Sequence, residues 1–272
     1  MSGLNNCSPK ISKEHYISKG ILREIGENSQ VMTAGLPFLG ENEKMLRESS
    51  LTSKVLCEYH NNELSPLDST AIRFINTLKN FEIELQHSIC IRKTEVFCGE
   101  DIESWALKTL CGMLASGNVI ISGEIRRESV PQLWVDLLSG KQKWPRGWGL
   151  YLHSTVGQQN YSQQSFAFQA GCITNNSKID AARFWFHGLP FVLLLHTPQD
   201  KSIFGHHHPG RIIWMKERIK RILEFSWQRR TGLSSHSFDF VTSGTGKSPL
   251  GYMDDSKSIM PVQALKILRG DS

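Results

Sequence analysis

The stretch LCEYHNNELSPLD, residues 56–68, places a cysteine and a histidine at the start of an expected helix. Cys57 and His60 have two residues between them, a spacing that lets a sulfur and an imidazole nitrogen reach one tetrahedral zinc ion. A serine–proline pair suits the first turn of a helix, and apolar residues then continue at helical spacing. The segment therefore predicts a helix over residues 64–78, with a metal-ligand pair just before it.

A second polar stretch, CSPKISKEHYI at residues 7–17, supplies the groups that would complete a site. Cys7 is the expected third zinc ligand, and metal binding would add folding free energy to a small region. Glu14 and Asn61 carry the carboxylate and amide oxygens that a hard divalent cation prefers. His15 can take a proton from water as a general base. Together these groups can cleave a phosphodiester bond.

The order of these groups resembles that of the HNH endonucleases. An acidic-His pair, Glu14-His15, precedes a Cys-x-x-His-Asn motif that ends at Asn61, and the resemblance covers residues 7–78. It implies a small treble-clef-like ββα-metal domain and makes His15 the general base. The ligands that it implies are Glu14 and Asn61 for a catalytic Mg²⁺ or another divalent cation, and Cys57 and His60, with Cys7, for a structural Zn²⁺.

The resemblance implies a metal-dependent endonuclease that hydrolyses DNA or RNA. A fused HNH domain of this layout is similar to bacterial and phage defence proteins. Leu4 stands where the family's zinc-bearing members have a first cysteine, so His15 is also a candidate for the fourth zinc ligand. In that case His15 is not a base, and the region is an inactive zinc-stabilised module that binds nucleic acid or protein. Zinc could instead be lost, with packing in its place.

Two further interpretations stay open. The polar residues of the first region could be ordinary surface and core groups, or a hydrolase site could lie further along the chain. The residues after 80 predict a β-rich region. An α+β protein is therefore expected, with a ββα-metal domain over residues 1–80, a β-rich mixed domain over 81–230 and a flexible tail over 231–272.

The elements expected after residue 80 follow from the period of the apolar residues. Alternation predicts a strand over Phe81–Ile91, and helical spacing predicts a helix over 101–114. Further strands are expected at 149–153, 165–173, 181–186 and 191–195, and a hairpin rather than a helix over 211–227.

The charge of the chain, +5 over 272 residues, permits nucleic-acid binding without requiring it. Residues 201–230 carry eight basic and two acidic side chains. They are either a solvated basic face or a contact with a polyanion, whose candidate residues are Lys216, Arg218, Lys220 and Arg221. The expected partners are DNA or RNA, with a possible protein partner on the β-rich domain.

The remaining composition bears on location and on three weaker motifs. No apolar run is long enough for a membrane span, no secretory signal is present, and the six cysteines suit a reducing cytosol, so a cytoplasmic protein is expected. The glycine–lysine stretch at 243–248 lacks the full phosphate-loop pattern and predicts a polar tail. Three histidines at 206–208 predict a polar loop, with a surface metal site as the alternative. Trp144 and Trp148, on either side of Arg146, either pack against the β-rich region or stack on a base or another flat ligand.

Overall fold

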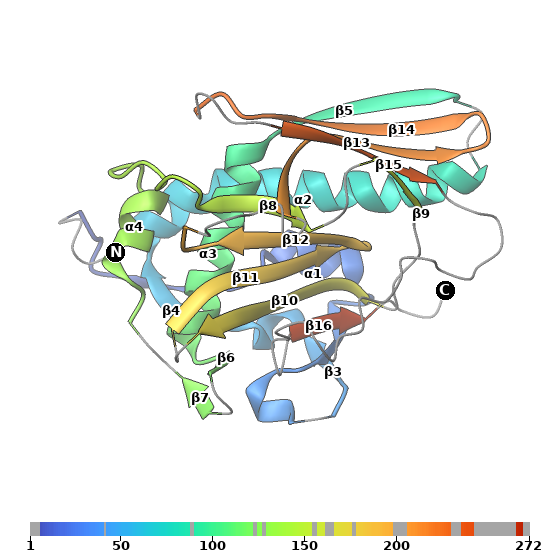
Figure 1. Ribbon diagram of the computed structural model, residues 1–272. Helices are drawn as coiled ribbons and strands as arrows, with labels where there is room; N and C mark the ends of the chain where they lie inside the picture. The colour runs from blue at the N-terminus through green and yellow to red at the C-terminus, as the bar shows by residue number, and fades with distance from the viewer. Residues whose placement is uncertain are drawn as a thin grey trace.

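The first third of the chain folds around an antiparallel strand pair and the long helix that follows it, Glu58–His87, which is labelled α2 in Figure 1. Its elements, in chain order, are β1 (Ile11–His15), α1 (Lys19–Ile25), β2 (Gln30–Ala34), η2 (Pro37–Leu39), β3 (Lys44–Arg47), η3 (Glu48–Ser50), β4 (Thr52–Cys57) and α2 (Glu58–His87). β1 pairs with β4, and α2 begins directly after β4 and contacts both strands. The structure, a computed structural model, describes residues 6–40, 42–87, 90–121, 124–126, 129–153, 157–160, 166–175, 178–197, 206–229, 235–241 and 265–268.

Helix α2 begins before the predicted helix start and passes through a proline. It starts at Glu58, so Pro66 lies inside it rather than in its first turn. Pro66 has no N–H group to donate to the carbonyl oxygen of Asn62. The hydroxyl of Ser65 donates to that oxygen instead, at 2.8 Å. This side-chain hydrogen bond replaces the missing one, and the helix continues.

The strand predicted over Phe81–Ile91 is wrong, because α2 continues to His87. Phe81 and Leu85 are buried, whereas Ile83 between them is 51% exposed. A strand would place all three side chains on one face, but a helix places only the first and third together. The boundary predicted at residue 80 therefore lies inside one continuous helix.

The rest of the chain builds most of a large sheet and three more helices. Its elements are β5 (Arg92–Cys98), α3 (Gly99–Ser116), β6 (Val119–Ile121), β7 (Glu124–Arg126), α4 (Gln132–Leu138), β8 (Gly149–His153), β9 (Gly157–Asn160), β10 (Phe166–Asn175), β11 (Lys178–Phe186), β12 (Leu189–Leu194), β13 (His206–Lys216), β14 (Ile219–Ser226), β15 (Ser235–Val241) and β16 (Leu265–Leu268). The strand order across the sheet is β3-β2-β16-β10-β11-β12-β8-β13-β14-β5, and β15 pairs with β13 and β9. The protein is α+β, as predicted.

Several predicted elements are confirmed and others are corrected. Helix α3, strands β8, β10, β11 and β12, and the β13·β14 hairpin all lie where the sequence places them. The three histidines at 206–208 begin β13 instead of forming a loop. The flexible tail predicted over 231–272 is wrong at two places, because strands β15 and β16 form there. β15 pairs with β13, and β16 pairs with β10 and β2. The 243–248 stretch lies outside the described residues, and no described helix is long and apolar enough to cross a membrane.

One sheet and one apolar core join the first 80 residues to the rest of the chain. Strands β2 and β3 extend the large sheet through β16. Phe74 of α2 shows the shared core, since its ring packs edge-on against four rings of later strands, β5, β11, β12 and β14. They are Phe97, Phe186, Phe191 and Phe225. The predicted 1–80 and 81–230 regions therefore do not have separate cores.

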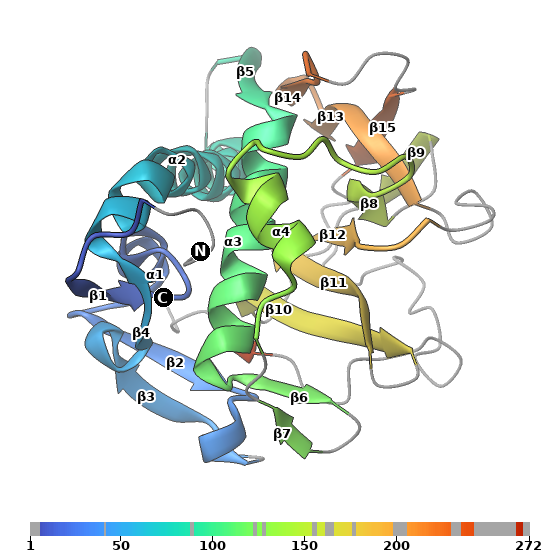
Figure 2. The same cartoon turned by 90° about the vertical axis from the view of Figure 1, so that its left-hand side faces the viewer.

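Helix α3 lies between the N-terminal strand pair and the large sheet (Figure 2). Its residues are buried on nearly every side, including Trp105 toward the sheet and Lys108 toward β1. Gly112 allows the close approach to the first region, because a Cβ atom there would lie 3.0 Å from the Cβ of Tyr16. This contact fixes α3 beside the end of β1.

Candidate functional site

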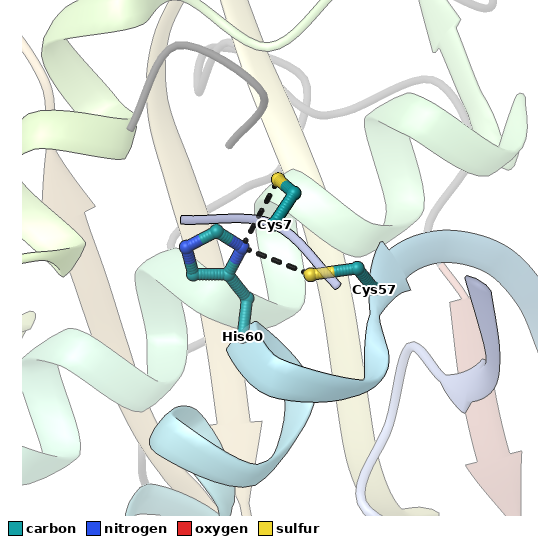
Figure 3. Close-up of side chains that lie close together, drawn as sticks. All are labelled: Cys7, Cys57 and His60. Carbon is teal, nitrogen blue, oxygen red and sulfur yellow. Dashed lines mark hydrogen bonds between the residues drawn. The ribbon is translucent and has the colours of Figure 1, made fainter. Parts of the chain in front are cut away.

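The predicted zinc ligands come together where β4 ends and α2 begins. Nδ1 of His60 lies 3.1 Å from Sγ of Cys57 and 3.5 Å from Sγ of Cys7 (Figure 3). A sulfur and a nitrogen bound to one tetrahedral zinc ion lie about 3.6 Å apart. The three ligand atoms all lie within 4.8 Å of one another. The predicted gathering of Cys7, Cys57 and His60 is confirmed, and the group could hold a metal ion.

The surroundings of His60 and Cys57 suit metal binding. Nε2 of His60 lies 2.8 Å from Oδ1 of Asn6, an acceptor, so Nε2 carries the hydrogen and Nδ1 presents its lone pair to both sulfurs. The hydrogen bond from the backbone N–H of His60 lowers the pKa of Cys57 to about 6, and Ser8 contributes to the same shift. Desolvation and the neighbouring Cys57 sulfur raise the pKa of Cys7. A bound cation would relieve the repulsion between the two sulfurs.

The predicted pair Glu14 and Asn61 is also brought together, and two residues that the sequence did not indicate, Lys108 and Asp68, lie beside it. A hydrogen bond links the Asn61 side chain to the Glu14 carboxylate. Nζ of Lys108, from α3, lies 3.1 Å from Oε1 of Glu14 and 2.6 Å from Oδ2 of Asp68. Burial raises the pKa of Glu14, and the Lys108 ammonium opposes part of that rise. The ammonium therefore sits between two carboxylates.

A short hydrogen-bond chain fixes the second carboxylate. The hydroxyl of Ser18 donates to Oδ1 of Asp68 at 2.5 Å. Nε1 of Trp105 donates to the same hydroxyl oxygen at 2.7 Å. Since Trp105 is 1% exposed and Ser18 is 4% exposed, this chain anchors Asp68 to the core.

His15 lies at the end of β1 that is distant from the Cys/His group. Ile11 lies opposite Cys57 in the strand pair. His15 is four residues further along β1, which places it about 13 Å from Ile11 along the strand. His15 is therefore outside the Cys/His group, and the alternative in which it is the fourth zinc ligand does not fit. Burial lowers the pKa of His15, and Lys19 lowers it further, so the ring is neutral at pH 7. Its buried Nε2 has no hydrogen-bond partner among the described residues.

A small cavity lies beside Glu14 and Lys108. Its volume is about 60 Å³, and His15 and Tyr16 also contribute to its lining. Apolar side chains of β4, α2, α3 and α4 form the rest of the wall. A buried water needs roughly 10–15 Å³ of such space, so water fits next to the carboxylate. The cavity is too small for a nucleotide.

The basic hairpin predicted to contact nucleic acid lies far from these groups. Lys220 pairs in register with Arg92, just beyond the end of α2, whereas His60 lies in the first turn of α2, about 40 Å away along the helix. Arg218 and Lys220 are exposed and Lys216 is partly exposed. Arg221 is fully buried, with Nε 2.6 Å from Oε2 of Glu84, so its assignment as a surface contact is wrong.

Replacing Arg221 by methionine is expected to destabilise the fold by about 2 kcal/mol. Breaking a fully buried ion pair costs about 3–5 kcal/mol, and the loss here is smaller because Glu84 is 27% exposed and keeps Lys93. Urea unfolding measures the change. The exposed Lys220→Met is the matched control and should change stability by less than about 0.5 kcal/mol. Equal effects in both variants would contradict the structural role of Arg221.

Sequence reasoning missed four residues that complete the carboxylate group: Ser18, Asp68, Trp105 and Lys108. Asp68 is the last residue of the stretch 56–68, and its place there gives no sign of a partner in a later helix. Lys108 was the more visible signal, because it lies in a helix whose neighbouring positions are nearly all apolar. A lysine without a polar face around it predicts a buried partner.

Comparison with protein-family models, curated proteins and solved structures gives no match to this chain.

Proposed function

We propose that the protein is an HNH-like endonuclease that hydrolyses phosphodiester bonds of DNA or RNA around a structural zinc ion. The observation that carries the proposal is the arrangement of β1, β4 and α2. It brings Cys7, Cys57 and His60 together and places Glu14 in contact with Asn61 nearby. Both groups were expected from the resemblance to that family.

The donor set favours zinc over other divalent ions. Two thiolates and one imidazole are ligands that Zn²⁺ prefers, whereas Mg²⁺ and Ca²⁺ prefer oxygen. Cys57, with its lowered pKa, and Nδ1 of His60, with its lone pair directed at the sulfurs, need little rearrangement to bind. The ion would join the start of α2 to the segment before β1 and so support the strand pair.

His15 is the proposed general base. It must be neutral to accept a proton, and burial holds its pKa below the ordinary value of about 6.5. The buried Nε2 without a described partner is the atom that would take the proton, and the neighbouring cavity can hold the water that gives it. The hydroxide so formed would attack the phosphorus of a phosphodiester at the mouth of the cavity, which is itself too small for a nucleotide. The P–O bond to the leaving nucleoside would break, and that oxygen would take up a proton from water.

A catalytic divalent cation on Glu14 and Asn61 does not fit beside Lys108. The ammonium is 3.1 Å from the carboxylate oxygen that such a cation would bind, and the two positive charges would repel each other. We therefore assign no step of the reaction to that cation. The same contact favours a second candidate, an inactive zinc-stabilised module that binds nucleic acid or protein.

Cleavage of plasmid DNA and structured RNA by wild type and His15→Ala separates the two candidates. The variant is expected to keep its bound zinc, since His15 is outside the Cys/His group. Its cleavage rate is expected to fall by at least about 100-fold. Wild-type cutting is expected to stay constant between about pH 7 and 8 and to fall below about pH 6.5, as the lowered pKa of His15 is approached.

The matched control is His87→Ala, at the exposed end of α2. It should cut like wild type. Equal cutting by His15→Ala would point to another site or a contaminant, and no cutting by any zinc-loaded protein would favour the binding module.

A further inference from the structure

The pocket around Glu14 already holds a cation. Nζ of Lys108 contacts Glu14 and Asp68 at 3.1 and 2.6 Å, and its side chain is only 7% exposed. The Asn61 side chain donates a hydrogen bond to the Glu14 carboxylate. Two facing carboxylates are oxygen ligands that a divalent cation also prefers.

We propose that the Lys108 ammonium takes the place of a divalent cation in this pocket, so that the native protein binds no metal ion between Glu14 and Asp68. The inference rests on the proposed function in so far as Glu14 and Asn61 belong to its site. It goes beyond that function by assigning the positive charge of the site to a residue of α3.

Two cations do not share this pocket. Mg²⁺ or Mn²⁺ bound to Glu14 would lie about 2.1 Å from its oxygen, within a few ångströms of Nζ. The repulsion between a divalent ion and an ammonium is strong where water is scarce. A divalent ion could enter only if Lys108 left.

Helix α3 gives Lys108 little freedom to leave. Trp105, on the same helix, is 1% exposed and Leu107 is fully buried. Gly112 lets the helix lie close to Tyr16, where an added Cβ would come within 3.0 Å of the Tyr16 Cβ. Moving α3 would expose the core that joins the two regions, and moving the Lys108 side chain alone would leave two partly buried carboxylates without a counter-charge.

The test is Mn²⁺ binding to zinc-loaded protein, with free Mn²⁺ followed by electron paramagnetic resonance. Wild type is expected to bind Mn²⁺ no better than Glu14→Gln. Lys108→Met, which removes the ammonium and keeps the carboxylates, is expected to bind one Mn²⁺ per chain at least 10-fold more tightly than wild type. The triple variant Glu14→Gln/Asp68→Asn/Lys108→Met keeps the shape without the charges and should bind none there.

Uptake of one Mn²⁺ by wild type that Glu14→Gln abolishes would overturn the proposal. So would a folded Lys108→Met protein that binds Mn²⁺ no better than the triple variant. If Lys108→Met does not fold, the comparison of wild type with Glu14→Gln still decides. Because binding is measured without nucleic acid, a protein that fails to cut leaves this result intact, and the two proposals fail separately.

Discussion

Cys57→Ser is expected to lose the proposed zinc ion and to melt at a lower temperature than wild type. The substitution removes one of two sulfur ligands, and the one whose pKa of about 6 makes it the readier thiolate. Without the ion, the link between Cys7 and His60, at the start of α2, is reduced to the direct contact between their side chains. Metal analysis should fall from one ion per chain to nearly none, and Tm should drop on the order of 10 °C.

Cys90→Ser is the matched control, because Cys90 is an exposed cysteine away from the Cys/His group. It should retain the metal ion and the wild-type Tm. A chelator should lower the Tm of wild type and Cys90→Ser but leave that of Cys57→Ser unchanged. Full metal content in Cys57→Ser would show that the ion is held elsewhere and would remove the support for a structural zinc.

Phe74→Ala is expected to destabilise the whole protein by about 3–5 kcal/mol. Phe74 is 1% exposed, and its ring contacts Phe97, Phe186, Phe191 and Phe225. Truncation therefore opens a cavity where α2 meets the large sheet. Urea unfolding, followed by circular dichroism and by tryptophan fluorescence, should show one shared transition at a lower midpoint.

Phe38→Ala provides the comparison, since Phe38 is 61% exposed. It should change stability by no more than about 0.5 kcal/mol. If Phe74→Ala instead gave two transitions, with only one of them shifted, the first region and the sheet would unfold independently. That result would restore the boundary predicted near residue 80.

The sequence predicted the parts of the site that depend on short spacings. Cys57, His60 and Asn61 lie within one turn of the start of α2, so their proximity follows from helix geometry alone. Cys7 and Glu14 were placed by the pairing expected of the first region, and β1·β4 provides it. Strand alternation likewise identified the β13·β14 hairpin.

The rest of the site depends on contacts between distant segments. Lys108 comes from a later helix, and a single lysine gives no direction in which its side chain points. Phe81, Ile83 and Leu85 are apolar at alternate positions, a pattern that fits a strand, and only the buried surface beneath α2 makes this segment helical. Arg221 belongs to a basic stretch by composition, but its side chain is buried and pairs with Glu84, which is far away in the sequence.

Strand β16 has a consequence for the order in which the protein forms during synthesis. It lies between β10 and β2, so it is the piece that attaches the β2·β3 pair to the large sheet. A ribosome that has released residues as far as β14 has released every other strand of that row but not its connecting strand. The β2·β3 pair must therefore wait, with an open edge, until residues 265–268 emerge.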